Sequence, residues 1–167
     1  MRAAILVLAL GSTAHAETFQ SRDIWGIDIS TLWEPRNRDA FGAGPVIRWE
    51  TAANTMPEWL DFVTSVGIFV DSADRSTAAL DFGLMVRGDG PLYATIKGGG
   101  TYANAYVMGE TIERLDWSAS GALGLRLGNW DVRATALTGG LFDGPVWLFS
   151  LGRNLFRVDT TTTSSWL

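Results

Sequence analysis

The stretch LDFGLMVRGDGPLYATIKG, residues 80–98, decides the fold. Apolar side chains alternate with polar or small ones on both sides of the turn Gly88-Asp89-Gly90-Pro91. The apolar positions are Leu80, Phe82, Leu84, Val86, Leu92, Ala94 and Ile96, and the intervening ones include Asp81, Arg87, Tyr93, Thr95 and Lys97. A period of two on either side of a Gly- and Pro-containing turn is typical of a β-hairpin with one apolar and one polar face. The pattern leaves open whether the apolar face meets water, a protein core or lipid.

The same alternation recurs along the rest of the chain, whereas helical periodicity is hard to find. It predicts eight strands, at residues 22–33, 44–51, 59–71, 77–88, 91–102, 114–128, 130–139 and 145–156. No linker or change of composition divides them. We therefore predict one all-β domain over residues 17–158, followed by a polar tail at 159–167 that is either a disordered extension or a late strand.

Residues 1–16 have the pattern of a secretory signal peptide. Arg2 precedes an apolar stretch from Ala3 to Leu10, and the small-x-small site Ala14-His15-Ala16 follows. The apolar stretch is too short to span a bilayer as a helix. Cleavage would leave an exported protein beginning at Glu17. The sequence contains no cysteine, so the exported fold must hold together without disulfides.

The charge balance excludes one class of partner. Acidic residues outnumber basic ones, 18 to 13, so the chain lacks the basic surface that nucleic acid requires. Lys97 is the only lysine. A soluble β protein normally covers its outward strand face with Lys and Glu, but the polar strand positions here are often Gly, Ser, Ala and Thr.

The connections between the predicted strands differ in length. Those after the first, third, fifth and seventh strands are the longer set, at about residues 34–43, 72–76, 103–113 and 140–144. Those after the fourth and sixth are tight, at Asp89-Gly90 and Asn129, while AANTMPE at 52–58 is longer than ideal. An up-and-down barrel of the outer membrane has short periplasmic turns and longer outer loops. This alternation matches that arrangement.

Two strands show the choice of faces most clearly. In the strand at 59–71, one face carries Leu60, Phe62, Val66, Ile68 and Val70, and the other face carries Asp61, Val63, Ser65, Gly67, Phe69 and Asp71. In the strand at 114–128, one face carries Trp117, Ala119, Leu123, Leu125 and Leu127, and the other face carries Asp116, Ser118, Ser120, Ala122, Gly124 and Arg126. A soluble lipocalin-like barrel points the apolar set inward, and a membrane barrel points it outward. Periodicity alone does not distinguish the two.

Three features favour lipid outside. The polar face is built of small residues, as the narrow lumen of an eight-stranded barrel requires. Tryptophans near strand ends suit the two membrane interfaces; they are Trp25, Trp33, Trp49, Trp59, Trp117, Trp130 and Trp147. The charged residues of the polar face include both signs, so they can neutralise one another inside the lumen; they are Asp28, Arg48, Glu50, Asp61, Asp81, Arg87, Lys97, Asp116, Arg126, Asp131 and Arg133.

We therefore predict an eight-stranded antiparallel up-and-down transmembrane β-barrel of the cell outer membrane. The alternative is a soluble periplasmic lipocalin-like barrel that binds a hydrophobic ligand in an apolar interior. The export signal, the eight strands and the aromatic Phe156 near the C-terminus resemble the small outer-membrane β-barrel proteins of Gram-negative bacteria. That resemblance implies closure of the barrel near an aromatic residue that assists insertion, although the tail continues beyond Phe156.

A second resemblance concerns GLRLGNWDVRATALTGG at 124–140 and SLGRNLF at 150–156. They look like the last three strands of the outer-membrane lipid A deacylases, which are barrel esterases with a Ser-His pair. The family's histidine falls on Ala136 and its serine on Thr138. The resemblance implies a shared fold, with a degenerate deacylase-like enzyme as a further alternative.

Composition restricts the possible chemistry. His15, the only histidine, lies in the predicted signal peptide. A mature chain without His or Cys has no Ser-His or Cys-His nucleophile and no site for zinc, copper or iron ligated by those residues. We expect no cofactor and no enzymatic activity. Asp61 and Asp81 are a candidate carboxylate pair, but more readily salt-bridge partners, and Asp71 to Asp74 is a candidate Ca²⁺ loop, but more readily a polar turn.

The sequence thus predicts a structural or surface-interaction protein with a filled, salt-bridged lumen. Its expected partners are outer-membrane lipid and an unidentified protein or surface ligand of the outer loops. The glycines at 98–100 are expected to kink a strand rather than to bind phosphate, because no helix follows them.

Overall fold

The computed structural model describes residues 17–35, 41–72, 75–107, 110–139 and 145–164. The predicted signal peptide at 1–16 lies outside these residues, as do parts of the four longer connections and the last three residues of the predicted tail. No helix among the described residues is long and apolar enough to cross a membrane.

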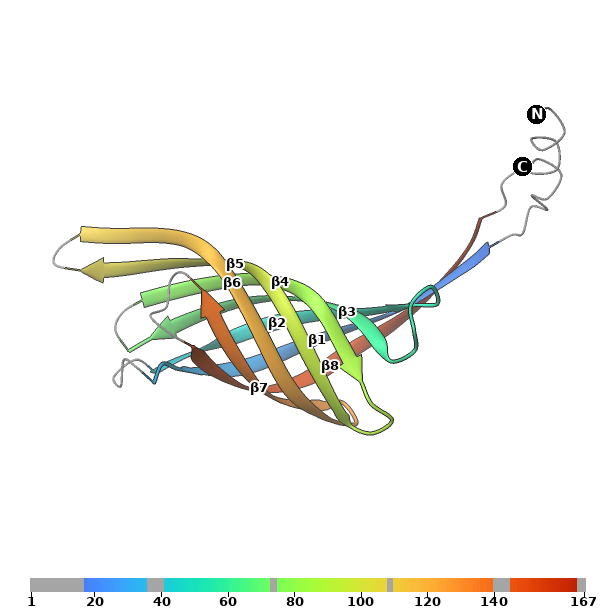
Figure 1. The fold of residues 1–167 in the computed structure, drawn as a ribbon. Coiled ribbons are helices and arrows are strands. Elements are labelled where there is room, and N and C mark those ends of the chain that lie inside the picture. Colours follow the sequence, from blue (N-terminus) through green and yellow to red (C-terminus); the bar gives the residue numbers. More distant parts are fainter. Residues whose placement is uncertain (1–16, 36–40, 73–74, 108–109, 140–144, 165–167) are drawn as a thin grey trace, which may run out of the picture.

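The described chain forms a closed antiparallel barrel of eight strands. The strands are β1 (Glu17–Trp33), β2 (Phe41–Ala53), β3 (Leu60–Asp71), β4 (Arg75–Arg87), β5 (Leu92–Val107), β6 (Glu110–Leu127), β7 (Trp130–Gly139) and β8 (Val146–Ser164). Each strand pairs with its neighbour in the chain, and β1 pairs with β8 to close the barrel (Figure 1). The predicted all-β, up-and-down architecture is confirmed.

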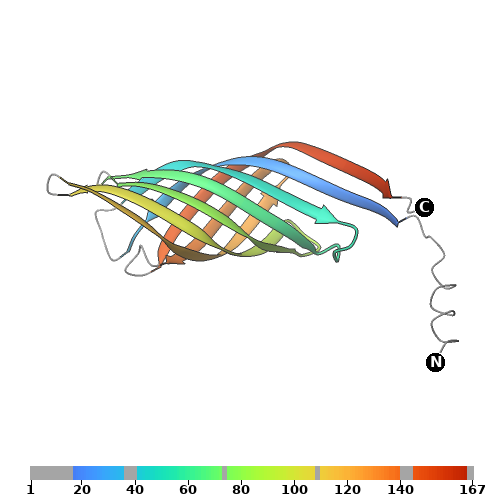
Figure 2. The same cartoon turned by 90° about the horizontal axis from the view of Figure 1, so that it is seen from above.

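The two ends of the barrel differ. We call the end at which β1 begins and β8 ends the terminal end, and the opposite end the loop end (Figure 2). The terminal end holds the connections at residues 54–59, 88–91 and 128–129. Gly128 in the last of these has a φ of 61°, which glycine adopts without strain and which suits a two-residue hairpin turn.

Two pairs of strands extend further than the sequence predicted. β5 and β6 continue to Val107 and from Glu110, so the predicted long connection at 103–113 is mostly strand. β8 continues to Ser164 and pairs with β1 as far as Glu17, so the boundary we predicted after residue 158 falls within a strand. We call Glu17–Arg22 with Asp159–Ser164 the terminal ribbon. We call Gly100–Val107 with Glu110–Trp117 the loop hairpin (Figure 1). The extension of β8 could not be recognised from the sequence, because its polar run of threonines carries no alternation.

Burial alternates along each strand and fixes the direction of its side chains. In β3, Val66, Ile68 and Val70 are exposed, whereas Asp61 and Ser65 are buried in the lumen. In β6, Leu123 is 71% exposed on the outside, and its neighbours Ala122 and Gly124 face inward. The apolar face therefore points away from the barrel axis. A lipocalin-like interior requires the reverse.

The lumen is filled in layers. Near the loop end, six apolar side chains form a cluster: Leu32, Val46, Phe69, Leu137, Val146 and Leu148. Polar and ionic side chains fill the middle, and Val63, Met85 and Tyr93 form a second cluster toward the terminal end. The glycines at 98–100 lie within β5, where a Cβ on Gly99 would collide with the backbone of Leu80 and the side chain of Asp81. Gly99 thus permits the close approach of β4 and β5.

Candidate functional site

The most concentrated chemistry of the barrel is an ionic network around Arg48 in the lumen. Arg48 is 1% exposed and forms ion pairs with three carboxylates, those of Asp28, Glu50 and Asp131. Its Nη2 lies 3.4 Å from Asp28 Oδ1 and 3.7 Å from Asp131 Oδ2. The same nitrogen donates to the Asn154 side chain at 3.1 Å. β1, β2, β7 and β8 therefore meet at one guanidinium group.

Two further arginines balance these carboxylates. Arg126 Nη2 donates to Glu50 Oε1 at 2.7 Å and to Asp131 Oδ2 at 3.1 Å. Arg133 donates to Asp28. Three guanidinium groups thus face three carboxylates, which is the condition under which buried charges are tolerated.

Tyr93 completes the network. Its hydroxyl donates to Asp131, and the Arg126 guanidinium lies 5.3 Å from the centre of its ring. Small residues make room for these groups. A Cβ on Gly152 would collide with the Asp28 carboxylate, and a Cβ on Gly124 would collide with the Tyr93 ring. The glycines on the lumen face therefore determine where the large side chains fit.

Lys97 and Asp81 form a second ionic group on β5 and β4. Lys97 Nζ donates to Ser65 Oγ at 2.6 Å and lies 3.8 Å from Asp81 Oδ2, while Ser118 Oγ donates to Asp81 Oδ1 at 3.0 Å. A cavity of about 40 Å³ adjoins Lys97 and Ser120. Its size and polar lining suit one or a few water molecules.

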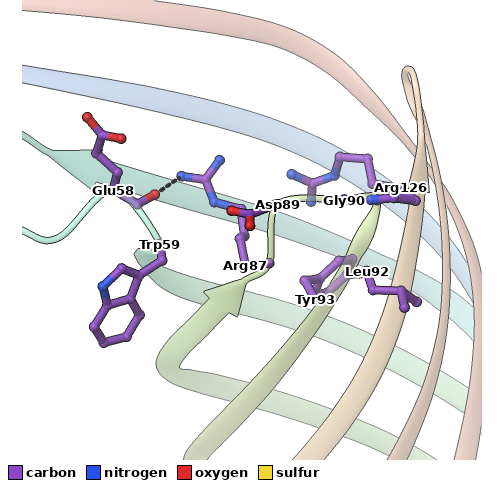
Figure 3. Close-up of a pocket in the computed structure, with 10 residues that line it drawn as sticks. Glu58, Trp59, Arg87, Asp89, Gly90, Leu92, Tyr93 and Arg126 are labelled. Carbon is purple, nitrogen blue, oxygen red and sulfur yellow. Dashed lines mark hydrogen bonds between the residues drawn. The ribbon is translucent and has the colours of Figure 1, made fainter.

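Asp61 forms a third ionic group, at the terminal end. Its Oδ1 accepts a hydrogen bond from Arg87 Nη2 at 2.8 Å and lies 3.8 Å from Arg22 Nη2. Arg87 Nη2 also donates to the backbone oxygen of Glu58 at 3.1 Å, while the Glu58 carboxylate points away (Figure 3). Two guanidinium groups therefore share a single carboxylate at this mouth of the barrel.

Ten of the eleven predicted network residues lie in these three groups. The eleventh, Asp116, lies beyond the end of β7, half-exposed, and pairs with Arg114 at 3.2 Å. Asp61 and Asp81 do not form a carboxylate pair, since Asp61 is opposite Met85 and Asp81 is opposite Ser65 in the β3–β4 ladder.

Sequence analysis missed Arg22, Tyr93 and Asn154. Arg22 and Tyr93 were detectable, because Arg22 has the parity of Asp28 along β1, and Tyr93 has the parity of Lys97 along β5. Asn154 was detectable as well, because it has the parity of Ser150 and Gly152 along β8, and the register shift of β8 falls after it, between Asn154 and Phe156.

The seven predicted interface tryptophans all face outward, although Trp49 is only half-exposed. Toward the terminal end, Trp25 stacks on Trp49 and on Phe156, each at 6.0 Å between ring centres. Trp59 and Trp130 adjoin the turns at this end. Near the loop end, Trp33 is paired with Trp147, and Trp117 lies where the β6–β7 ladder ends.

The outward positions between these two sets of tryptophans are almost free of charge. On the described strands Arg153 is the single charged residue there, and its guanidinium lies 5.8 Å from the Trp130 ring. Ala136 and Thr138, the positions of the deacylase pair, also lie on this outward face of β7. The Ca²⁺ loop considered at Asp71 to Asp74 falls largely outside the described residues.

Comparison with known structures identifies the fold. The chain is similar to Ail, the attachment invasion locus protein of Yersinia pestis, solved with the heparin analogue sucrose octasulfate. The two share 15% identity and a TM-score of 0.56, over 84% of this chain and 99% of Ail. It is also similar to Neisserial surface protein A, at 13% identity and a TM-score of 0.54, over 85% of this chain and 98% of that protein.

A de novo designed transmembrane β-barrel matches as well, at 10% identity and a TM-score of 0.55, over 79% of this chain and 95% of the design. No family model and no curated protein matches the sequence. These likenesses show the fold: the chain is a small eight-stranded β-barrel of the outer-membrane type, as the sequence predicted. None of these matches supports the likeness to the lipid A deacylases.

Proposed function

We propose that this protein resides in the outer membrane, where it serves a structural or surface-contact role through its loop end. The observation that carries the proposal is the separation of side chains by face. Apolar side chains cover the outside between two sets of tryptophans, and the buried ionic groups lie inside. An exterior covered with apolar side chains is stable in apolar surroundings, and the hydrocarbon core of a bilayer provides these surroundings for a transmembrane barrel.

The filled lumen argues against a channel. An eight-stranded barrel is just wide enough for its side chains to fill the interior. Here the Arg48 network occupies the middle, and the apolar cluster around Phe69 and Val146 closes the loop end. We therefore propose that the network stabilises the barrel and that the protein conducts no solutes.

We also propose a non-enzymatic role. Thr138 would need a neighbouring base to act as a nucleophile, and position 136 is an alanine. The carboxylates of the lumen are engaged with arginine or lysine, which is the arrangement of structural ion pairs.

The loop hairpin is the part best placed for contact with other molecules. β6 pairs with β5 alone from Glu110 to Trp117, and the side chains from Glu110 to Leu115 are exposed. The outer membrane protein Ail and Neisserial surface protein A are precedents for this fold in the outer membrane and at the cell surface. The loop hairpin carries three acidic residues, Glu110, Glu113 and Asp116, and one basic residue, Arg114. Because this charge does not suit an anionic ligand such as the heparin analogue, we propose a protein ligand for this chain.

Membrane residence is tested by fractionation and by gel migration of boiled and unboiled samples. We expect the protein in the membrane fraction, extractable only by detergent, with faster migration of the unboiled sample because the folded barrel resists the gel detergent. Release of the protein with the soluble periplasmic contents would contradict the proposal.

Orientation is tested with single cysteines, because the native chain has none. Glu113→Cys places a thiol on the loop hairpin, and Asn129→Cys places one in a turn at the terminal end. A membrane-impermeant maleimide applied to intact cells should label the first variant and spare the second until the cells are lysed. The opposite pattern would place the loop hairpin in the periplasm and refute a surface role.

A further inference from the structure

A polar cleft opens at the terminal end of the barrel, outside the ionic network around Arg48. Its volume is about 700 Å³, and it lies between the terminal ribbon and the turn that joins β2 to β3. Gln20, Arg22, Arg157 and Thr161 line it from the ribbon, Asn54 lines it from the turn, and Arg87 lines it from β4.

Two adjoining hollows extend this mouth. One contains Arg22, Arg87, Arg126 and Arg157, and the other contains Arg87 and Arg126 beside Glu58 and Asp89 (Figure 3). Arginines from four different strands therefore face one connected entrance. Arg126 is engaged with Glu50 and Asp131, and Arg157 pairs with Asp159 at 2.9 Å.

Arg22 and Arg87 are left with too few acceptors. Each guanidinium group has five N–H donors. Arg87 donates to Asp61 and to the backbone oxygen of Glu58, and Arg22 reaches the shared Asp61 only at 3.8 Å. The Nε atoms of both arginines are buried without a hydrogen-bond partner. The pKa of Arg22 is lowered, by its burial and then by the neighbouring Arg87. An additional negative charge would relieve this electrostatic strain.

The pairing of the nearby groups favours a ligand of low charge. The six network members around Arg48 balance, Lys97 balances Asp81, and Arg157 pairs with Asp159, while Arg22 and Arg87 share Asp61 and the Glu58 residue also lines the cleft. Asp159 and Glu58 lie beside the cleft and would repel a doubly charged phosphate more strongly than a carboxylate.

The cleft also suits an extended peptide. β1 pairs only with β8 between Glu17 and Gln20, apart from a hydrogen bond from Asn54 N to Gln20 O. The edge of the ribbon that faces the turn thus has backbone groups free to pair with an added strand. Gln20 and Asn54 line the cleft beside that edge, and Thr161 lines it from β8.

We propose that the terminal cleft binds the C-terminal carboxylate of a peptide, held between Arg22 and Arg87 with its backbone along β1. For a barrel oriented with its loops outward, such peptides would come from the periplasm. The carboxylate is the essential element of recognition, and the backbone contacts set the direction of the chain.

The test uses two probes that differ only in charge: acetyl-trialanine with a free C-terminal carboxylate, and the same peptide as its C-terminal amide. Each is titrated into the full mature chain folded in uncharged detergent micelles at low salt, with binding followed by calorimetry or backbone NMR shifts. We expect saturable binding of the acid, weakened by added salt, and at least about tenfold weaker binding of the amide. Equal binding of the two probes, or no saturable binding of the acid, would overturn the proposal.

Variants locate the site. Arg22→Gln should weaken binding of the acid about tenfold, and Arg157→Gln, an exposed change on the ribbon, should weaken it less. Arg114→Gln, at the loop end, is the matched control and should leave the affinity unchanged. Unboiled gel migration confirms that each variant is folded. Unchanged affinity in both cleft variants would refute the site, and tighter binding of inorganic phosphate than of the peptide would refute the occupant.

Discussion

Two arginines of the same barrel, Arg48 and Arg153, show how differently its two faces treat a charge. Arg48 points inward, is 1% exposed and is surrounded by three carboxylates. Arg153 points outward, with the Trp130 ring as its only described contact partner. Inside, an ion needs ions of the opposite sign, because the narrow lumen offers little water. Outside, a charge is tolerated only near an interface that its long side chain can reach. The same period-two alternation therefore places ion-paired side chains in the lumen and apolar side chains on the outer face.

The largest expected effect breaks the inner half of this comparison. Arg48→Leu leaves the carboxylates of Asp28, Glu50 and Asp131 with two arginines in place of three. We expect a loss of about 3–5 kcal/mol in the free energy of unfolding, because an uncompensated buried charge remains. Urea unfolding in micelles, followed by tryptophan fluorescence, measures it.

Arg153→Leu is the matched control on the outer face. It removes the contact with Trp130 and replaces a charge with an apolar side chain, so we expect a change within about 1 kcal/mol. Equal losses in the two variants would show that the barrel does not distinguish its faces in this way.

The next effect breaks the outer half. Leu123→Arg introduces a charge on the outward face of β6, where its neighbours in the ladders are Ala94 and Ala134. We expect a loss of about 2–4 kcal/mol in lipid vesicles, or failure to insert, if this position lies near the bilayer midplane. Leu127→Arg, beside the turn at the terminal end, should lose only about 0–1 kcal/mol. No dependence on position would argue against a bilayer around the barrel.

The face of each strand could be predicted from sequence because side-chain direction has a strict period of two. Asp61, Arg87 and Lys97 were assigned to the lumen for that reason alone. Their partners could not be predicted in the same way. The contact of Arg48 with Asp131 joins β2 to β7, and such contacts depend on the tilt and stagger of the closed barrel. The position of Asp116 beyond the end of β7 depends on the same stagger.

The long strands were predicted least well. The side chains from Asp159 to Thr162 in the terminal ribbon are exposed, so its threonines show none of the alternation that reveals a half-buried strand. The cleft beside it was missed for the same reason. Arg22 and Arg157 come together through the pairing of β1 with β8, and their local sequences give no signal of that contact.

A smaller effect tests the aromatic contacts toward the terminal end. Trp25→Ala removes the stacking on both Trp49 and Phe156. Removing the side chain lowers the free energy of unfolding through the lost apolar area. We expect a further loss of about 1–3 kcal/mol, because each of the two aromatic pairs contributes about 0.5–1.5 kcal/mol. Trp117→Ala, with no described ring partner, is the control and should lose only the area contribution.

The smallest effect sharpens the comparison within the lumen itself. Ser150 and Ser120 are both buried, but Ser150 Oγ lies 2.7 Å from Ser30 Oγ, whereas Ser120 Oγ has no described protein partner. Ser150→Ala should lose about 1 kcal/mol, because it leaves the Ser30 hydroxyl unpaired. Ser120→Ala should be within about 0.5 kcal/mol of the native chain. If the hydroxyl of Ser120 holds a water in the cavity beside Lys97, its removal would instead produce a loss like that of Ser150→Ala. The difference between the two serine variants, measured by urea unfolding, therefore reports whether the middle of the lumen is dry or hydrated.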